Sequence, residues 1–198
     1  MSYEDGKKAE DFLRGKCQSG MAKEIVEYLG LELGKAFVGK FNNGEIQVMI
    51  DESVRGKDVF VIQPTCQPAN DTLMELLIMA DALKRASAKH ITAVVPYYGY
   101  ARQDRKTRGR EPITSKLVAD LMTRAGITRV VTMDLHAGQI QGSLISLVDH
   151  LRFGLHSSLG ILTRKRRNRL GDLVVVSPDL GGVTRARRPG RPGSTCGL

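Results

Sequence analysis

The chain lacks the features that would place it among membrane, secreted or metal-cluster proteins. None of its apolar runs approaches the roughly 20 residues of a membrane-spanning helix. The first fifteen residues mix acidic and basic side chains without an apolar block, so no secretory signal is expected. The three cysteines, Cys17, Cys66 and Cys196, are odd in number and lack metal or redox spacing. We therefore expect a cytoplasmic protein with no membrane partner and with buried or incidental thiols.

An even distribution of positive charge is also missing. The net charge of +9 would suggest a nucleic-acid partner, but residues 164–191 hold nine cations and two acids and so carry +7 of it. The remainder of the chain is nearly neutral, and we expect no specific nucleic-acid partner. The hydrophobic share of 41% and the length of 198 residues suffice for one large or two small globular domains.

Apolar residues recur with two alternating spacings through most of the chain. Helical spacing predicts helices at 22–29, 73–83 and 114–125, with Gly30 and Gly126 as stops and Thr72 with Glu75 as a capping box. Short apolar or alternating runs predict strands at 46–50, 58–63, 91–95, 130–133 and 173–176. This alternation favours an α/β fold with a mainly parallel sheet covered by helices on both faces.

One loop concentrates the chemically distinctive side chains. Three tyrosines and five cations follow the strand predicted at 91–95: Tyr97, Tyr98, Tyr100, Arg102, Arg105, Lys106, Arg108 and Arg110. The C-terminal end of a buried strand is where open α/β sheets bind ligands. Aromatic faces suit a flat ring and guanidinium groups suit phosphate oxygens, which indicates a site for a ring compound with several phosphates. A solvated, mobile basic loop is the alternative.

Three further segments carry candidate binding groups, each with a structural alternative. Residues 41–45 (FNNGE) form a turn between two strands, which either binds a base or is only good turn chemistry. His136 follows Asp134 at a strand end and is either a metal or phosphate contact or a structural polar group. Asp179 follows the strand predicted at 173–176, and its carboxylate is either a magnesium ligand or a helix N-cap.

Six segments in a fixed order resemble a single family. They are FNNGEIQV, ESVRGKDVFVIQPTCQPANDTLMELL, DALKRASAKHITAVVPYYGYARQDRK, PITSKLVADL, DLHAGQIQG and VVVSPDLGGVTRAR. The chain resembles the ribose-phosphate pyrophosphokinases (phosphoribosyl pyrophosphate synthetases) over 33–142 and again over 171–187. The resemblance implies two similar α/β domains of the phosphoribosyltransferase type, here 1–149 and an incomplete 150–187, before a tail, 188–198, expected to be disordered. It also implies a homo-oligomer, a dimer or a hexamer.

The resemblance further implies a reaction and a set of site residues. The family transfers the terminal pyrophosphate of ATP to the 1-hydroxyl of ribose 5-phosphate with Mg²⁺ and releases AMP, so the protein mainly positions substrates and neutralises charge. The implied ATP-binding residues are Phe41, Asn43, Gly44, Glu45, Arg102 and Gln103. The turn at 41–45 would reach adenine across a subunit boundary, although Asn43 stands where the family often has Asp. His136 and Asp179 are the implied magnesium-associated pair.

The chain departs from the family pattern in four places. The beginning, EDFLRGKCQSG, lacks the usual short apolar strand, so no strand is expected there. Residues 143–147 and 153–171 differ from the family's segments, and the similarity stops after Arg187. The family's catalytic lysine loop and sugar-phosphate loop have no counterpart, so the catalytic residues are unassigned and activity of this chain alone is not expected. The alternative is a non-catalytic remnant or a regulatory partner subunit that retains the ATP half-site.

Overall fold

The computed structural model describes residues 10–15, 19–138, 140–143, 147–151, 175–176 and 196–197. The chain divides into two units, Met1–Leu151 and Arg152–Leu198, close to the domain boundary predicted after residue 149. The described helices are α1 (Ser19–Leu29), α2 (Ala69–Arg85), α3 (Thr114–Ala125) and α4 (Ile140–Ser143). The strands of the first unit are β1 (Glu10–Arg14), β2 (Ala36–Lys40), β3 (Ile46–Ile50), β4 (Asp58–Ile62), β5 (His90–Val95), β6 (Arg129–Met133) and β7 (Leu147–Leu151).

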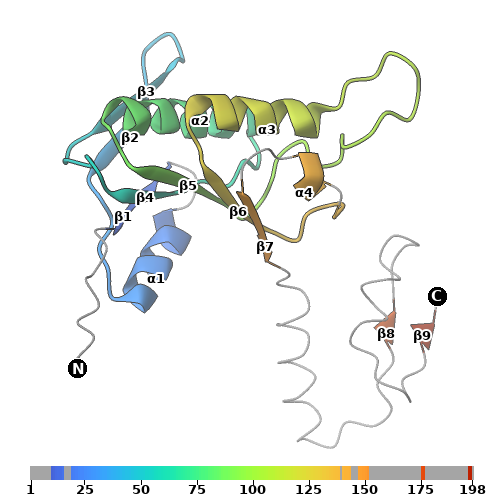
Figure 1. Cartoon of the computed structure of the whole chain (residues 1–198), viewed down its shortest axis with the longest axis horizontal. Coiled ribbons are helices and arrows are strands. Elements are labelled where there is room, and N and C mark those ends of the chain that lie inside the picture. Colours follow the sequence, from blue (N-terminus) through green and yellow to red (C-terminus); the bar gives the residue numbers. More distant parts are fainter. Residues whose placement is uncertain are drawn as a thin grey trace, which may run out of the picture. The chain divides into compact units, whose positions relative to one another are not determined.

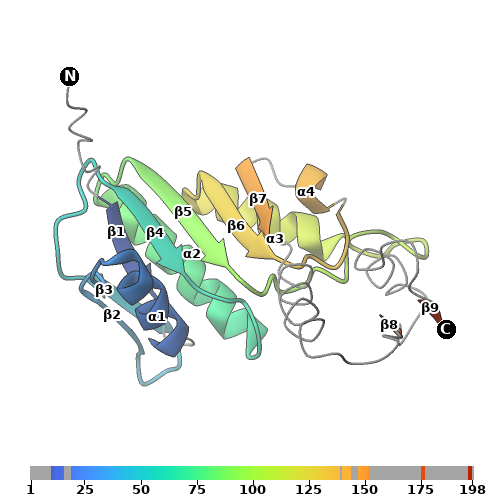
Figure 2. The ribbon, with the colours of Figure 1, turned by 90° about the horizontal axis from the view of Figure 1, so that it is seen from below.

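A parallel sheet forms the centre of the first unit. Its five strands follow the order β1-β4-β5-β6-β7, and every neighbouring pair is parallel. Helix α1 covers one face, and α2 and α3 cover the other (Figures 1 and 2). The predicted α/β class, with a mainly parallel sheet and helices on both faces, is confirmed. No helix within the described ranges has the length and apolar content needed to cross a membrane.

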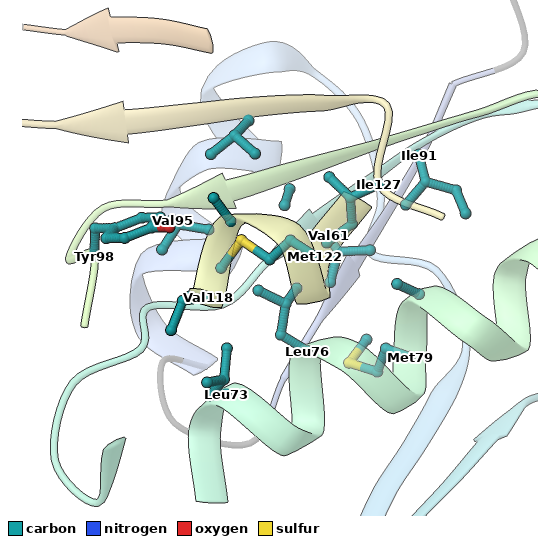
Figure 3. Packing of buried hydrophobic residues seen from close by; sticks show 14 of the residues in the cluster. Val61, Leu73, Leu76, Met79, Ile91, Val95, Tyr98, Val118, Met122 and Ile127 are labelled. Atoms are coloured by element: carbon teal, nitrogen blue, oxygen red, sulfur yellow. The ribbon is translucent and has the colours of Figure 1, made fainter. Parts of the chain in front are cut away.

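Alternating side chains of the central strands supply the two apolar layers. In β4, Val59 and Val61 belong to the large core beneath α2 and α3, whereas Ile62 belongs to the smaller core beneath α1. Because successive strand residues point to opposite faces, a strand covered on both sides must be apolar at nearly every residue. On the α1 side, the rings of Phe12 and Phe60 stack with their centroids 4.8 Å apart. Figure 3 shows the larger core, which α2 and α3 line with Leu73, Leu76, Met79, Val118 and Met122.

Strands β2 and β3 form an antiparallel hairpin beside the main sheet. Ala36, Val38, Val48 and Ile50 pack against the larger core. Phe37 and Met49 are paired across the hairpin on its opposite face and are exposed. The alternation predicted for residues 46–50 is therefore confirmed, and the hairpin places the turn at 41–45 at its tip.

The predicted helix stops are confirmed, but the predicted capping box is wrong. Gly30 and Gly126 take positive φ angles of 66° and 115° directly after α1 and α3, a conformation that glycine adopts without strain. Helix α2 begins at Ala69, and its N-cap residue, Pro68, makes no side-chain cap. The hydroxyl of Thr72 donates to the Cys66 carbonyl at 2.9 Å instead. Glu75 is buried within the helix and does not turn back to its start.

Two strands of the sheet were not predicted. The expectation that no strand forms near the N-terminus is wrong, because β1 pairs with β4 from Glu10 to Arg14. Only Phe12 and Leu13 in that strand are large apolar residues, and both are buried. Strand β7 pairs with β6 through a run, LVDHL, whose middle is polar. Tertiary pairing therefore stabilises strands whose own patterns are too weak to indicate them.

Little of the second unit lies within the described residues. Val175–Val176 (β8) and Cys196–Gly197 (β9) form a short parallel pair. Val175 and Val176 lie in the strand predicted at 173–176. The pairing of Cys196 and Gly197 differs from the disorder predicted for 188–198 at these two residues. The predicted changes at 153–171 lie outside the described residues.

Candidate functional site

The loops that follow β4, β5 and β6 lie at one edge of the sheet. These three strands are parallel neighbours, so their carboxyl ends meet at the same edge. The loops comprise residues 63–68, 96–113 and 134–138. They contain Arg102, Gln103 and His136 from the predicted site. The fold therefore brings these three residues to the edge at which parallel α/β sheets bind ligands.

The first part of the loop after β5 is anchored in the protein core. Tyr98 is only 4% exposed, and its hydroxyl donates to the Ser115 carbonyl at 3.0 Å. Figure 3 shows its ring beside Val95 at the margin of the core. Burial, and to a lesser degree the charge of Asp120, raises the pKa of Tyr98. The interpretation of all three tyrosines as ring-binding groups is thus wrong for Tyr98, while Tyr97 is 55% exposed.

A tight turn presents Arg102 immediately beyond this anchor. The N–H of Gln103 donates to the Tyr100 carbonyl at 3.0 Å, which closes the turn around Arg102. The Ser115 N–H donates to the Gln103 carbonyl at 3.1 Å, and the Thr114 hydroxyl donates to the Gln103 side-chain oxygen. The Tyr100 hydroxyl also donates to the Asn70 side chain of α2. Arg102 is exposed on a turn held from both sides, an arrangement suited to binding an anion.

The remainder of the same loop is exposed and rich in cations. Two of its backbone N–H groups bond to Glu111: Oε2 accepts hydrogen bonds from Thr107 N and Arg108 N at 2.8 and 2.9 Å. The Thr107 hydroxyl donates to the same oxygen at 2.8 Å. The hydrogen bond from the Thr107 side chain, with those from the two backbone groups, lowers the pKa of Glu111. The Glu111 carboxylate therefore holds the outer part of the basic loop at Thr107 and Arg108.

The loop after β4 contains a buried polar network that was not predicted. The Gln63 amide nitrogen donates to the Thr72 carbonyl at 3.2 Å and to Glu75 Oε2 at 3.0 Å. Gln63 and Thr65 are almost wholly buried. The hydroxyl of Thr65 reaches the neighbouring loop after β5, where it donates to the Tyr97 carbonyl at 3.0 Å. Polar residues directly after an apolar strand, in the segment QPT, were the available signal for this network.

The loop after β6 carries two exposed groups suited to a metal or a phosphate, Asp134 and His136. One backbone and one side-chain acceptor of β7 hold this loop: Asp134 N donates to the Leu151 carbonyl at 3.0 Å, and Leu135 N donates to His150 Nε2 at 3.0 Å. Within the described ranges, no group of three or more His, Cys, Asp and Glu side chains is placed to hold a metal ion. Mg²⁺ binds through few carboxylates when waters and substrate phosphates complete its shell, so the Asp134 carboxylate fits magnesium carried by a nucleotide, and the His136 imidazole fits a phosphate oxygen or a bound water. Asp179 lies outside the described residues.

The second group of predicted residues occupies the hairpin turn. The Phe41 N–H donates to the Glu45 carbonyl at 2.8 Å, and the Glu45 N–H donates to Asn43 Oδ1 at 3.2 Å. Gly44 has a positive φ of 90°. Phe41 is 50% exposed, and Asn43, Gly44 and Glu45 are also exposed. The segment thus has the hydrogen bonds of a stable turn and also an accessible aromatic ring, so the structure is compatible with both alternatives given for residues 41–45.

The two groups lie apart in one chain. Both views separate the hairpin turn from the long loop that precedes α3 (Figures 1 and 2). Lys40, next to the turn, forms an ion pair with Asp71 in the first turn of α2, which links the tip end of the hairpin to that helix. The structure therefore assembles Arg102, Gln103 and His136 at the edge of the sheet and leaves residues 41–45 on a separate projection.

These features define an α/β protein whose candidate binding groups lie in loops at the carboxyl edge of a parallel sheet. Residues 11–126 match the family model described as the N-terminal domain of ribose phosphate pyrophosphokinase. The chain belongs to the ribose-phosphate pyrophosphokinase family.

Individual relatives agree with this assignment. The chain is 60% identical over 168 residues to a ribose-phosphate pyrophosphokinase of Bacillus caldolyticus, and this match covers 85% of the chain and 52% of the relative. It is 56% identical over 173 residues to that of Helicobacter pylori strain 26695, covering 87% and 53%. A crystal structure of phosphoribosylpyrophosphate synthetase from Mycobacterium smegmatis matches with a TM-score of 0.88 and 44% identity, covering 96% of this chain and 63% of that one. The chain spans about half the length of these curated relatives.

Proposed function

We propose that this chain supplies the ATP-binding part of a ribose-phosphate diphosphokinase. The reaction is Mg²⁺-dependent transfer of the terminal pyrophosphate of ATP to the 1-hydroxyl of ribose 5-phosphate, which yields 5-phosphoribosyl 1-diphosphate and AMP. The observation that carries the proposal is the turn closed between Tyr100 and Gln103, which presents Arg102 at the carboxyl edge of the sheet. Membership of the family, shown over residues 11–126, supports it.

Each described group has a role in this proposal. Arg102 binds phosphate oxygens through its guanidinium group, which stays charged at physiological pH and offers several donors. The backbone carbonyl and the side-chain oxygen of Gln103 accept hydrogen bonds from α3, and its backbone N–H bonds Tyr100. The side-chain amide nitrogen is therefore the group offered to the nucleotide. His136 contacts a phosphate oxygen or a water bound to the metal, because Mg²⁺ itself prefers oxygen ligands. Bound magnesium would neutralise phosphate charge.

In this proposal, the hairpin turn binds the adenine of a nucleotide whose phosphates are held by a neighbouring copy of the chain. Residues 41–45 are exposed and lie apart from Arg102 in their own chain. A nucleotide that needs both groups is therefore held between two chains, which requires a homo-oligomer. The Phe41 ring provides a stacking face, while the Asn43 and Glu45 side chains provide polar groups for the base edge. Sedimentation of the full chain, with and without Mg²⁺ and ATP, measures whether such an oligomer forms.

Calorimetric titration of the full chain with ATP and Mg²⁺ tests the proposal. Arg102→Ala should raise the Kd for ATP by roughly tenfold to a hundredfold, since a hydrogen bond to a charged group contributes about 1.5–3 kcal/mol. Arg85→Ala is the matched control, because Arg85 lies in the last turn of α2, where its guanidinium group pairs with the Asp81 carboxylate one turn earlier. It should leave the Kd unchanged.

Two results would contradict the assignment of this site. One is failure of the unsubstituted chain to bind ATP in the presence of Mg²⁺. The other is equal ATP affinity in the unsubstituted chain and Arg102→Ala. Release of AMP that depends on ribose 5-phosphate then distinguishes the full reaction from the alternative, a nucleotide-binding partner without turnover. Binding of ATP without AMP release would favour the partner.

A further inference from the structure

Thr65 joins the loop after β4 to the loop after β5. Its N–H donates to the Tyr97 carbonyl at 2.9 Å, and its hydroxyl donates to the same oxygen at 3.0 Å. The hydroxyl oxygen also accepts a hydrogen bond from the Gly99 N–H at 2.7 Å. One side chain therefore satisfies a donor and an acceptor that lie two residues apart in the neighbouring loop.

Water cannot replace this contact. Thr65 is 1% exposed, and Gly99 is buried against it. A Cβ atom at Gly99 would lie 2.5 Å from the Thr65 carbonyl oxygen, so the two backbones already touch. Without the hydroxyl, the Tyr97 carbonyl keeps its bond from the Thr65 N–H, but the buried Gly99 N–H loses its acceptor. A buried donor left without an acceptor carries the cost of desolvation, which favours displacement of the loop towards solvent.

The segment held by Thr65 leads directly into the arginine turn. Gly99 is followed by Tyr100, whose carbonyl closes the turn around Arg102. A shift at Gly99 is therefore transmitted within three residues to the guanidinium group. The far side of the turn is fixed separately, through the Gln103 carbonyl and α3. On the near side, Thr65 adds a buried contact at Tyr97 and Gly99 to the one that the Tyr98 hydroxyl makes with Ser115.

We propose that Thr65 is a positioning residue for the ATP-binding turn: its buried hydroxyl fixes the loop after β5 at Tyr97 and Gly99 and so sets the place of Arg102. This inference rests on the proposed function, because it names the ligand of the turn as ATP. It requires no contact between Thr65 and the nucleotide.

Three variants of the full chain separate positioning from simple stability. Thr65→Val removes the hydroxyl with little change of shape, and Thr65→Ser keeps the hydroxyl. Thr132→Val is the matched control, since the Thr132 hydroxyl is buried in β6 and has no hydrogen-bond partner among the described residues. Thermal melting first establishes a temperature at which all three variants are folded. If Thr65→Val does not fold, Thr65→Ala takes its place.

Titration with ATP and Mg²⁺ is the first measurement. Thr65→Val should raise the Kd for ATP by roughly tenfold, the effect expected when a displaced Arg102 loses about one hydrogen bond to a charged phosphate. Thr65→Ser and Thr132→Val should bind ATP like the unsubstituted chain. A lower melting temperature for Thr65→Val with unchanged ATP affinity would show a purely structural role and overturn the inference.

Hydrogen exchange of the backbone amides is the second measurement and needs no nucleotide. Thr65→Val should speed exchange at residues 97–103 and leave β6 unchanged, whereas Thr65→Ser should match the unsubstituted chain. Equal exchange in Thr65→Val and the unsubstituted chain would overturn the inference. If the unsubstituted chain fails to bind ATP, the proposed function is wrong, and exchange still decides whether Thr65 fixes the loop.

Discussion

The loop after β5 and the hairpin turn at 41–45 carry the two groups of predicted nucleotide-binding residues, and they are built differently. On its buried side, the loop is fixed by contacts of Thr65 and Tyr98 with residues distant in sequence. The turn is fixed by bonds among its own residues, from Phe41 to Glu45. Both are exposed where a ligand would meet them.

The difference determines which substitutions each region tolerates. A loop anchored in the core responds to changes at buried residues that never touch the ligand, because displacement of the anchor moves the whole segment. A turn set by local geometry responds only to changes within the turn. Substitutions that perturb one region and not the other therefore test whether the two act as separate parts of one site.

Gly99→Ala should have the largest effect. Its new Cβ would lie 2.5 Å from the Thr65 carbonyl oxygen, which is backbone and cannot swing away. We expect a loss of about 1–3 kcal/mol in the free energy of unfolding, as for other overpacked sites, together with weaker ATP binding. Urea unfolding and ATP titration measure the two effects. Gly109→Ala is the control in the same loop, where a Cβ would meet no atom within 4 Å, and unchanged values for Gly99→Ala would refute the close approach.

Gly44→Ala should have an intermediate effect confined to the hairpin turn. Space is available, but Gly44 has a φ of 90°, which an alanine adopts only with strain. We expect a loss of about 1 kcal/mol in the free energy of unfolding, with no change in hydrogen exchange at residues 97–103.

Gly20→Ala in α1 is the matched control for that variant. Gly20 lacks a positive φ, and no atom lies within 4 Å of its Cβ place, so the alanine should stabilise by up to about 1 kcal/mol. Faster exchange at 97–103 in Gly44→Ala would show that the two regions are coupled.

Acidification should have the smallest effect, confined to the outer part of the loop. The hydrogen bonds from Thr107 and Arg108 lower the pKa of Glu111, so its folded-state pKa lies below its unfolded-state pKa. Its contribution to loop order is complete above the unfolded-state pKa and is lost as the pH falls through the folded-state pKa. Exchange at Thr107 and Arg108, corrected for intrinsic rates, should therefore rise only in acid. Glu111→Gln should remove this pH dependence, and its persistence in that variant would assign it to another group.

Strong local patterns predicted most of the sheet and its helices. The apolar runs at 58–62 and 91–95 indicate buried strands, and Gly126 ends a helix whose apolar spacing is clear. The weakly patterned β1 and β7 escaped prediction, since pairing with β4 and β6 compensates for their charged and polar residues. The capping box failed because the Thr72 hydroxyl found carbonyl partners in the loop before the helix.

The sequence indicated the loops in which the candidate binding residues lie, but not the buried contacts that hold those loops. Arg102, Gln103 and His136 were placed at the carboxyl edge of parallel strands because strand ends can be recognised from apolar runs. Tyr98 was grouped with the exposed tyrosines, although its ring belongs to the core. Nothing in a linear pattern distinguishes the three tyrosines, because burial depends on which way the loop leaves the strand. Their proposed roles, like that of Asp179, stay predictions.

The amino-acid sequence alone determined the α/β class and the loops in which binding groups are concentrated, because strand and helix periodicity and turn chemistry are local properties of the chain. The resemblance of six of its segments to known sequences indicated the family. The tertiary structure decided which tyrosine is buried, that residues 10–14 join the sheet, and that Thr65 holds the neighbouring loop. These outcomes depend on contacts between segments distant in the sequence, 17 residues apart for Tyr98 and Ser115 and 34 for Thr65 and Gly99, which no local pattern encodes.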